Sequence, residues 1–326
     1  MPENDYIYAV TRVHAHEQHL LNRQDAEALI AAADTDEVLR LLKEKGWGSP
    51  SGADAGAEAL LNAETHKTWF LIQELCGDIP AFALFRHGND FHNLKAAVKL
   101  TYTAQTGDTA GFFIPYGNVE VQTILAAAET HDFSALPEAL AAAGRAAYEV
   151  LAHTGNGQLC DMAIDVAALE SIWQAGQAAT SELLREYARI TVDSANIRAA
   201  VRCQRMGKSR EFAGRAIADA GTLEKAALVA AADGTFEDIC QLLHRSAYAD
   251  AVEALRVSMA SFECWCDNAV MEMIRPQRTN YFGIEPLAAF VLGRENEIRL
   301  ARLILSAKTN RLESAAVRER LRVTYV

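Results

Sequence analysis

The sequence predicts an all-α protein on the strength of three observations. Apolar side chains over residues 183–201 recur at three- and four-residue steps, the spacing of one face of an amphipathic helix. The alanine-rich run 226–232 consists of residues with high helix propensity. The chain contains no convincing alternating run of β-branched residues bounded by turn residues, so strands are expected to be incidental at most.

Glycines and the spacing of apolar residues also predict where loops and helices lie along the chain. Glycines place the clearest loops at 46–56, 107–117 and 155–157. Two long helical faces come after them, the first interrupted only by the polar Ser194. The first face comprises Leu183, Tyr187, Ile190, Ile197 and Val201, and the second Leu287, Phe290, Val291, Ile298, Ala301 and Leu305. Each row gives its helix an apolar stripe that must pack against a neighbour.

The composition is that of an ordinary globular chain. Half of the 326 residues are apolar and 23% are charged, which allows a sizeable core and excludes an intrinsically disordered chain. The formal net charge of −12 argues against nucleic acid and anionic lipid as ligands, because both carry negative phosphates. Proteins are therefore the expected class of partner.

Neither membrane insertion nor secretion is expected. Uncharged stretches fall well short of the roughly 20 consecutive apolar residues that a membrane-spanning helix needs. The acidic start, residues 1–5, lacks the apolar core of a secretory signal. The six cysteines form no CxxC pair, which indicates reduced thiols in a cytosolic protein.

A short pattern recurs along the chain and indicates internal repetition. The sequence DFHNLKAAVK over 90–99 is echoed by DSANIRAAVR over 193–202. A degenerate third copy contains Glu297, Leu300, Arg302 and Leu305, and a tryptophan precedes each copy, at Trp69, Trp173 and Trp265. The shared tryptophans and the common Asp-x-x-Asn spacing favour a true triplication over chance matching of helical sequences.

The third repeat is incomplete at the C-terminus, and its second half is expected at the N-terminus. Glu37–Leu42 followed by Trp47 resembles Asp238–Leu243 followed by Tyr248. Half a repeat cannot bury its apolar face alone, so the two ends of the chain are expected to pack together. The expected units are 69–168, 169–264, and a third made of 1–68 with 265–326. They would close into a pseudo-threefold funnel with a central cavity.

These residues resemble the C subunit of the V-type and A-type ATPases, called subunit d in the eukaryotic enzyme. The stretch Asn89–Lys95 is similar to the family's Asn-Asp-Tyr-His-Asn-Leu-Lys signature, with Phe91 in place of tyrosine. The opening 6–21 and the ending 282–326 resemble the family's N-terminal helix and its C-terminal segment. The order and spacing of these motifs over essentially the whole chain carry the resemblance, since each motif alone is a helix-packing pattern.

The resemblance implies a non-catalytic component of a rotary ATPase, located in the cytoplasm and peripheral to the membrane. The implied partners are the central-stalk subunits D and F and the membrane proteolipid (c/K) ring. The implied role is that of a socket that couples the stalk to the ring for ion transport or ATP synthesis. No nucleotide, metal or other cofactor, and no direct membrane insertion, is implied.

The sharpest polar constellation is the repeated Asp-x-x-Asn-x-Lys/Arg motif, with its degenerate third copy. Its members are Asp90, Asn93, Lys95, Asp193, Asn196, Arg198, Glu297 and Arg302. The favoured interpretation is structural: buried or half-buried hydrogen bonds and ion pairs that fix how one unit meets the next. The functional interpretation is a ring of polar groups facing a socket for the stalk.

Two other functions remain open from the residues alone. An unrelated α-helical repeat scaffold could display a concave surface to a different protein. A helical metalloenzyme could use His14, His16 and His19, although no carboxylate completes a motif such as HExxH. Gly207-Lys208-Ser209 resembles the end of a phosphate-binding loop, but Arg202 stands where the first glycine is required.

Overall fold

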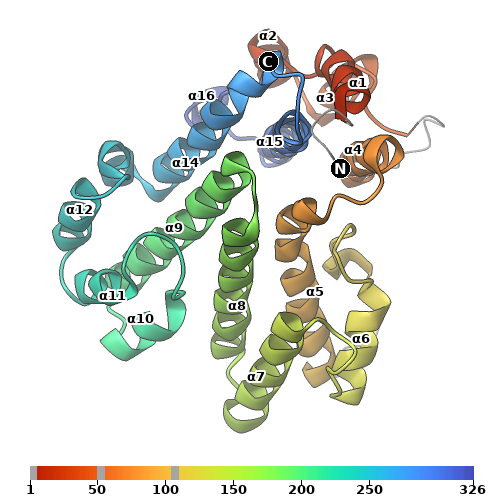
Figure 1. Cartoon of the computed structure of the whole chain (residues 1–326). Helices are drawn as coiled ribbons and strands as arrows, with labels where there is room; N and C mark the ends of the chain where they lie inside the picture. The colour runs from red at the N-terminus through yellow and green to blue at the C-terminus, as the bar shows by residue number, and fades with distance from the viewer. Residues whose placement is uncertain (1–5, 50–55, 104–109) are drawn as a thin grey trace. The chain divides into compact units, whose positions relative to one another are not determined.

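The computed structural model describes residues 6–49, 56–103 and 110–326. These residues form α-helices and short 3-10 turns with no strand among them, which confirms the all-α prediction (Figure 1). The loops predicted at 46–56 and 107–117 fall partly outside the described residues, and so does the start of the chain, where no secretory signal is expected.

The α-helices of the described residues differ widely in length. They are α1 Ile7–Glu17, α2 Arg23–Ala31, α3 Thr35–Glu44, α4 Ala57–Cys76, α5 Ala83–Thr103, α6 Val121–Thr130, α7 Glu138–Thr154, α8 Gly157–Ala178, α9 Glu182–Arg205, α10 Arg210–Ala216, α11 Lys225–Asp233, α12 Phe236–His244, α13 Val252–Val257, α14 Met259–Ile274, α15 Glu285–Thr309 and α16 Ser314–Arg318. Several begin at a residue whose side chain accepts a hydrogen bond from the first helical turn, as Asn22 does before α2 and Thr235 before α12.

The predicted helical faces lie on α9 and α15, but both helices are buried over more than one stripe. In α9 the buried residues include Leu184, Val192 and Asp193, which fall outside the predicted row. In α15 even Arg294 and Glu297 are buried. Periodicity therefore located these helices correctly and underestimated how much of their surface is covered.

The chain folds into two compact units. The terminal unit consists of the segment up to Ile79 together with Glu253–Val326, and the central unit is Pro80–Val252. The division into three repeat units stays a prediction.

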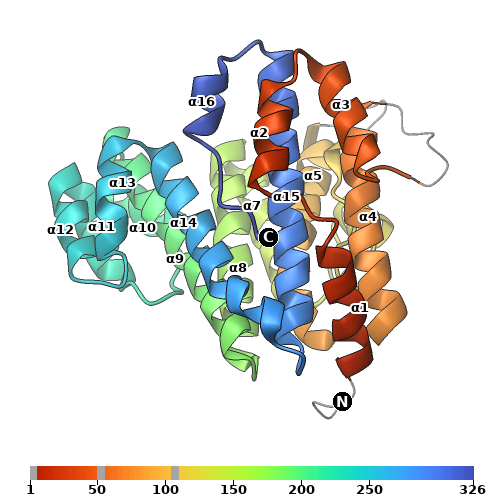
Figure 2. The same ribbon diagram turned by 90° about the horizontal axis from the view of Figure 1, so that it is seen from above.

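In the terminal unit, the first and last segments of the chain share one core. Ile30, Val38 and Leu60 from α2, α3 and α4 pack in the same cluster as Ile304 and Leu305 of α15. Figure 2 shows α15 beside the N-terminal helices. Lys308 of α15 also donates to the carbonyl oxygens of Ile30 and Ala32, both at 2.6 Å, which satisfies the C-terminal end of α2.

The C-terminal end of the chain is fastened to α1 within this unit. The Tyr325 hydroxyl donates to Glu17 Oε1 at 2.9 Å, and the His14 ring lies 2.8 Å from Glu17 Oε2 through Nδ1. The Tyr325 ring packs against Gly293, where any Cβ would come within 2.9 Å of it. Burial first, and then the Glu17 carboxylate, raise the pKa of Tyr325, so its hydroxyl stays a donor at neutral pH.

Replacing Tyr325 with phenylalanine is expected to lower the free energy of unfolding by about 1–3 kcal/mol, because the buried Glu17 loses a donor. Urea denaturation measures the loss. Tyr281→Phe serves as the control, because the Tyr281 side chain is 52% exposed. Equal midpoints for the two variants would show that the Tyr325 hydroxyl does not stabilise the fold.

In the central unit, α5, α6, α7 and α8 enclose a second core. Leu94, Ile124, Ala147 and Ile164 are buried in it, one from each helix. Figure 1 shows α5 and α8 side by side with their axes nearly parallel. Gly144 is required in α7, since a Cβ there would meet the ring of Phe133.

None of the helices in the described part of the chain combines the length and hydrophobicity that crossing a bilayer requires. None of the six cysteines forms a disulfide; four of them are buried and two are half-buried.

Candidate functional site

The first copy of the Asp-x-x-Asn motif, on α5, hydrogen-bonds the loop that precedes α6. Asp90 Oδ1 accepts from the backbone N–H groups of Asn118 at 2.7 Å and Val119 at 3.0 Å. Asn93 pairs with both backbone groups of Ile114, accepting from its N–H at 2.8 Å and donating to its carbonyl at 2.9 Å. The loop therefore obtains from α5 the hydrogen bonds that it cannot make within itself.

The second copy, on α9, makes the same kind of contact with the loop that precedes α11. Asp193 Oδ1 accepts from the Thr222 backbone N–H at 2.8 Å. Asn196 accepts from the Ala218 N–H at 2.9 Å and donates to the carbonyls of Ala218 and Ala220. Asp193 and Asn196 are both fully buried. Gly221, with φ +95°, leaves the space that the Asp193 carboxylate needs.

The third copy, on α15, keeps only the carboxylate contact. Glu297 Oε1 accepts from the backbone N–H of Leu21, which lies just before α2. In all three copies, a buried carboxylate on a long helix thus accepts hydrogen bonds from backbone N–H groups that precede a shorter helix. These N–H groups lie within three residues of the first residue of the shorter helix. We call this contact the carboxylate brace, made by Asp90, Asp193 and Glu297.

The basic members of the motif do not take part in the carboxylate braces. Lys95 forms an ion pair with Asp165 of α8, and the Asp165 side chain is exposed. Arg302 pairs with Glu58 at 3.2 Å on the surface. Arg198 is half-buried. Such partly exposed pairs contribute about 0–1 kcal/mol each, far less than the buried bonds of the brace.

An arginine and an aromatic ring accompany the second brace. Arg189, four residues before Asp193, binds both carboxylate oxygens of Glu186 and lies 5.3 Å from the centroid of the Tyr248 ring. The Tyr248 hydroxyl donates to Asp193 Oδ2 at 3.1 Å. The network is closed, because each of these polar groups has a partner.

The third brace has a similar arrangement in the terminal unit, which we call the Arg294 cluster. Arg294 forms buried ion pairs with Glu297 on its own helix and with Glu64 of α4, and its guanidinium lies 5.2 Å from the centroid of the Trp47 ring. Glu64 also accepts from Lys67 and from the Gly48 backbone N–H, both at 2.7 Å. Burial first, and then the Glu64 carboxylate, raise the pKa of Glu297, while Arg294 opposes that shift.

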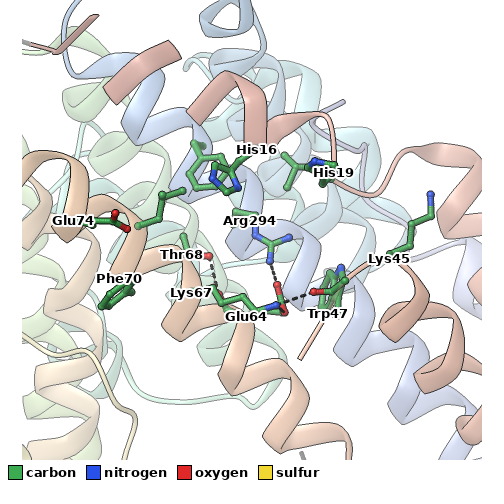
Figure 3. Close-up of a pocket in the computed structure, with 14 residues that line it drawn as sticks. His16, His19, Lys45, Trp47, Glu64, Lys67, Thr68, Phe70, Glu74 and Arg294 are labelled. Carbon is green, nitrogen blue, oxygen red and sulfur yellow. Dashed lines mark hydrogen bonds and ion pairs between the residues drawn. The ribbon is translucent and has the colours of Figure 1, made fainter. Parts of the chain in front are cut away.

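A cavity of about 440 Å³ opens beside the Arg294 cluster (Figure 3). We call it the Trp47 pocket. It lies within the terminal unit, between the last turns of α1, the turn after α3, α4 and the start of α15. Its lining includes His16, His19, Leu20, Lys45, Trp47, Glu64, Lys67, Phe70, Leu71, Glu74, Phe290 and Arg294. The Nε1 atom of Trp47 is buried with no hydrogen-bond partner among the described residues.

Comparison with known proteins assigns the family. The model of the ATP synthase (C/AC39) subunit family matches residues 9–320. The chain belongs to this family. It is 24% identical over 320 residues to the C subunit of the V-type sodium ATPase of Enterococcus hirae, covering 96% of this chain and 97% of that protein. It is 22% identical to the C subunit of the A-type ATP synthase of Methanocaldococcus jannaschii, covering 97% of this chain and 86% of that protein.

Membership of the C/AC39 family confirms the resemblance stated from the sequence, and it rules out the unrelated repeat scaffold. The chain spans nearly the full length of both relatives, so the family assignment applies to the whole sequence and not to one segment of it.

The histidines of α1 and of the turn after it do not converge on one point in this C/AC39 family member. His14 lies against Glu17 and the Asn280 carbonyl, whereas His16 and His19 line the Trp47 pocket. The described residues contain no group of three or more His, Cys, Asp and Glu side chains placed to hold a metal.

Gly207 has the positive φ of a residue that ends a helix, and Ser209 caps the start of α10 by accepting from Phe212 N–H. The segment Gly207–Ser209 is therefore a turn between two helices, with no strand before it in the described part of the chain.

Sequence reasoning missed the arginines that accompany the braces. A signal was present, because Arg189 stands four residues before Asp193 and Arg294 three residues before Glu297. No such signal pointed to Glu64, which tertiary packing brings to Arg294 from another helix.

Proposed function

We propose that this chain is the non-catalytic rotor adapter of a V-type or A-type ATPase, a socket that couples the central stalk to the membrane proteolipid ring. The observation that carries the proposal is the match to the C/AC39 family over residues 9–320, together with two relatives that are both C subunits of such an ATPase. In this proposal, stalk subunits D and F enter the socket and the chain sits on the cytoplasmic face of the ring.

The proposed architecture is a pseudo-threefold funnel of units 69–168, 169–264 and 1–68 with 265–326. Three carboxylate braces at corresponding sequence positions support it, because each joins a long helix to the start of a shorter one. The shared core of α2, α3, α4 and α15 supports the third unit, since it combines both ends of the chain.

The use of the buried polar groups supports a mechanical role. Asp90, Asp193 and Asn196 form their hydrogen bonds with backbone and side-chain groups of the chain itself, and we propose that they do not bind or protonate a substrate. A scaffold fixed in this way resists deformation, which a part that transmits torque requires. We therefore propose that the chain has no enzymatic activity of its own.

Complementary charge is the proposed means by which the socket holds the stalk. The chain carries 43 acidic and 31 basic residues, so an acidic part of the socket would attract basic stalk side chains. Such contacts are screened over about 8 Å at physiological ionic strength, and stalk binding should therefore weaken as salt is raised.

An ATPase complex rebuilt without this chain is expected to hydrolyse ATP but to lose ion transport. Both activities are measured in vesicles, with the complete complex and the isolated chain as references. The isolated chain should show no hydrolysis above background, and adding it back to the depleted complex should restore transport. Transport at normal coupling without the chain would rule out the adapter function.

A further inference from the structure

Residues 321–326 lie along α14 and α15 without regular secondary structure, and we call this segment the strap. In Figure 2 it runs from α16 between those two helices. Residues 322–326 form no backbone–backbone hydrogen bond with any other described residue. Tyr325 is buried, whereas the other five residues of the strap are half-buried. The strap is therefore held by side chains of the neighbouring helices and not by a backbone ladder.

Side chains of α14 contact the first half of the strap. Asn268 Oδ1 accepts from the backbone N–H of Val323 at 2.8 Å, and Asp267 Oδ2 accepts from Arg322 Nε at the same distance. Both acceptors stand in the middle of α14 and are themselves half-buried. This helix thus binds one backbone group and one side chain of the strap.

Side chains of α15 and α1 contact the second half. Asn296 Nδ2 donates to the Val323 carbonyl at 3.1 Å, so the N–H and C=O groups of one residue are bound by two different helices. Gly293, one turn earlier on α15, leaves space for the Tyr325 ring, since any Cβ there would come within 2.9 Å of it. The Tyr325 hydroxyl donates to Glu17 of α1. The backbone of Val323 is thus clamped, and Tyr325 is the buried anchor of the strap.

Grooves that bind short peptides use the same two kinds of contact. Hydrogen bonds to the main chain supply affinity for an extended segment, and pockets for individual side chains supply specificity. The bonds to the backbone of Val323 do not depend on its side chain. Asp267 favours a basic side chain at position 322, and Glu17 together with the space over Gly293 favours a tyrosine at position 325. The groove is therefore suited to an arginine followed three residues later by a tyrosine.

The strap has few of the contacts that would make it unfold together with the rest of the terminal unit. The shared core of α2, α3, α4 and α15 includes Leu321 at its edge and no later residue of the strap. Releasing residues 322–326 breaks no backbone hydrogen bond of α14 or α15, because none of those bonds ends on them. Segments with few buried apolar contacts open at a lower free energy than the unit that carries them. We therefore expect the strap to detach while the terminal unit stays folded.

We propose that the groove between α14 and α15 is a binding site for an extended protein segment in which arginine stands three residues before tyrosine, and that the strap occupies it as a detachable ligand. Asn268 and Asn296 bind the backbone of the segment, Asp267 binds its arginine, and Glu17 binds its tyrosine hydroxyl. Release of the strap frees the groove for the same pattern on another chain. The site is separate from the proposed rotor function and does not depend on it.

Hydrogen exchange in the wild-type chain tests whether the strap detaches on its own. The two probes are the backbone amides of Val323, which is bonded to Asn268, and of Leu300, which is buried in α15. We expect the Val323 amide to exchange at least about a hundredfold faster than that of Leu300. Low urea should accelerate Leu300 steeply and Val323 hardly at all, because local opening exposes little surface. Equal rates with equal urea dependence would show that the strap unfolds with the whole unit, and would overturn the proposal.

Peptide binding in trans tests the groove itself. Arg322→Glu combined with Tyr325→Ala places a carboxylate against Asp267 and removes the anchor, so the strap should leave the groove. A fluorescent peptide with the sequence of residues 319–326 should then bind this full-length variant saturably in anisotropy titrations. It should bind the wild-type chain at least about tenfold more weakly, because the tethered strap competes at a high effective concentration. A double variant that does not fold, an absence of binding, or equal binding to both chains would each contradict the proposal.

Substitutions in the peptide and in α15 test where the tyrosine binds. A peptide with phenylalanine in place of its tyrosine should show a Kd raised about tenfold, because the buried Glu17 loses a donor. Gly293→Ala in the double variant should also raise the Kd about tenfold or more, since the new Cβ takes the place of the tyrosine ring. Gly88→Ala on α5 is the matched control and should leave the Kd unchanged, because a Cβ there meets no described atom within 4 Å. Similar affinities for the two glycine variants would mean that the peptide binds elsewhere, and the proposal would be wrong.

Discussion

Replacing Arg294 with methionine is expected to lower the free energy of unfolding by about 3–5 kcal/mol, because it leaves buried carboxylates without their shared cation. Arg294 is 7% exposed, and its partners Glu64 and Glu297 are also buried. Glu64 would keep Lys67, but Glu297 would keep only the Leu21 backbone donor. Methionine fills much of the volume of the arginine side chain. The loss of stability therefore measures the missing charge and not the creation of a cavity.

Urea denaturation of the isolated chain measures this loss, and Arg302→Met is the matched control on the same helix. Arg302 also pairs with a glutamate of α4, but both side chains of that pair are largely exposed, so its loss should cost at most about 1 kcal/mol. Similar midpoints for the two variants would mean that the Arg294 cluster does not stabilise the terminal unit.

Replacing Asn196 with leucine is expected to cost about 3 kcal/mol or more. The change removes the partners of one backbone N–H and two carbonyl oxygens, at Ala218 and Ala220, in a site with no solvent access. Leucine is close in size to asparagine, so the loss comes mainly from unsatisfied polar groups and not from volume.

The matched variants for this prediction are Asn93→Leu and Arg202→Met. Asn93 bonds both backbone groups of Ile114 in the other copy of the motif, so its replacement should destabilise the chain to a similar extent. Arg202 is exposed on the same helix as Asn196, and its replacement should change the stability by no more than about 0.5 kcal/mol. If Asn196→Leu were as mild as Arg202→Met, the motif would not hold the loop.

The sequence by itself determined the helices and the family. Residues three or four apart on a helix are neighbours whatever the rest of the chain does, so the rows beginning at Leu183 and Leu287 located α9 and α15 without tertiary information. The repeated Asp-x-x-Asn spacing was visible for the same reason, and the order of such motifs identified the family later found over residues 9–320.

Only the tertiary structure decided what the polar side chains contact. Asn196 finds its partners beyond α10, and Glu64 meets Arg294 across 230 residues of sequence. The burial of Arg294 between Glu64 and Glu297 was also not predicted from the sequence. Local periodicity records which face of a helix a residue occupies. The partner across the interface, and with it the burial of a charged side chain such as Arg294, depends on how distant helices pack.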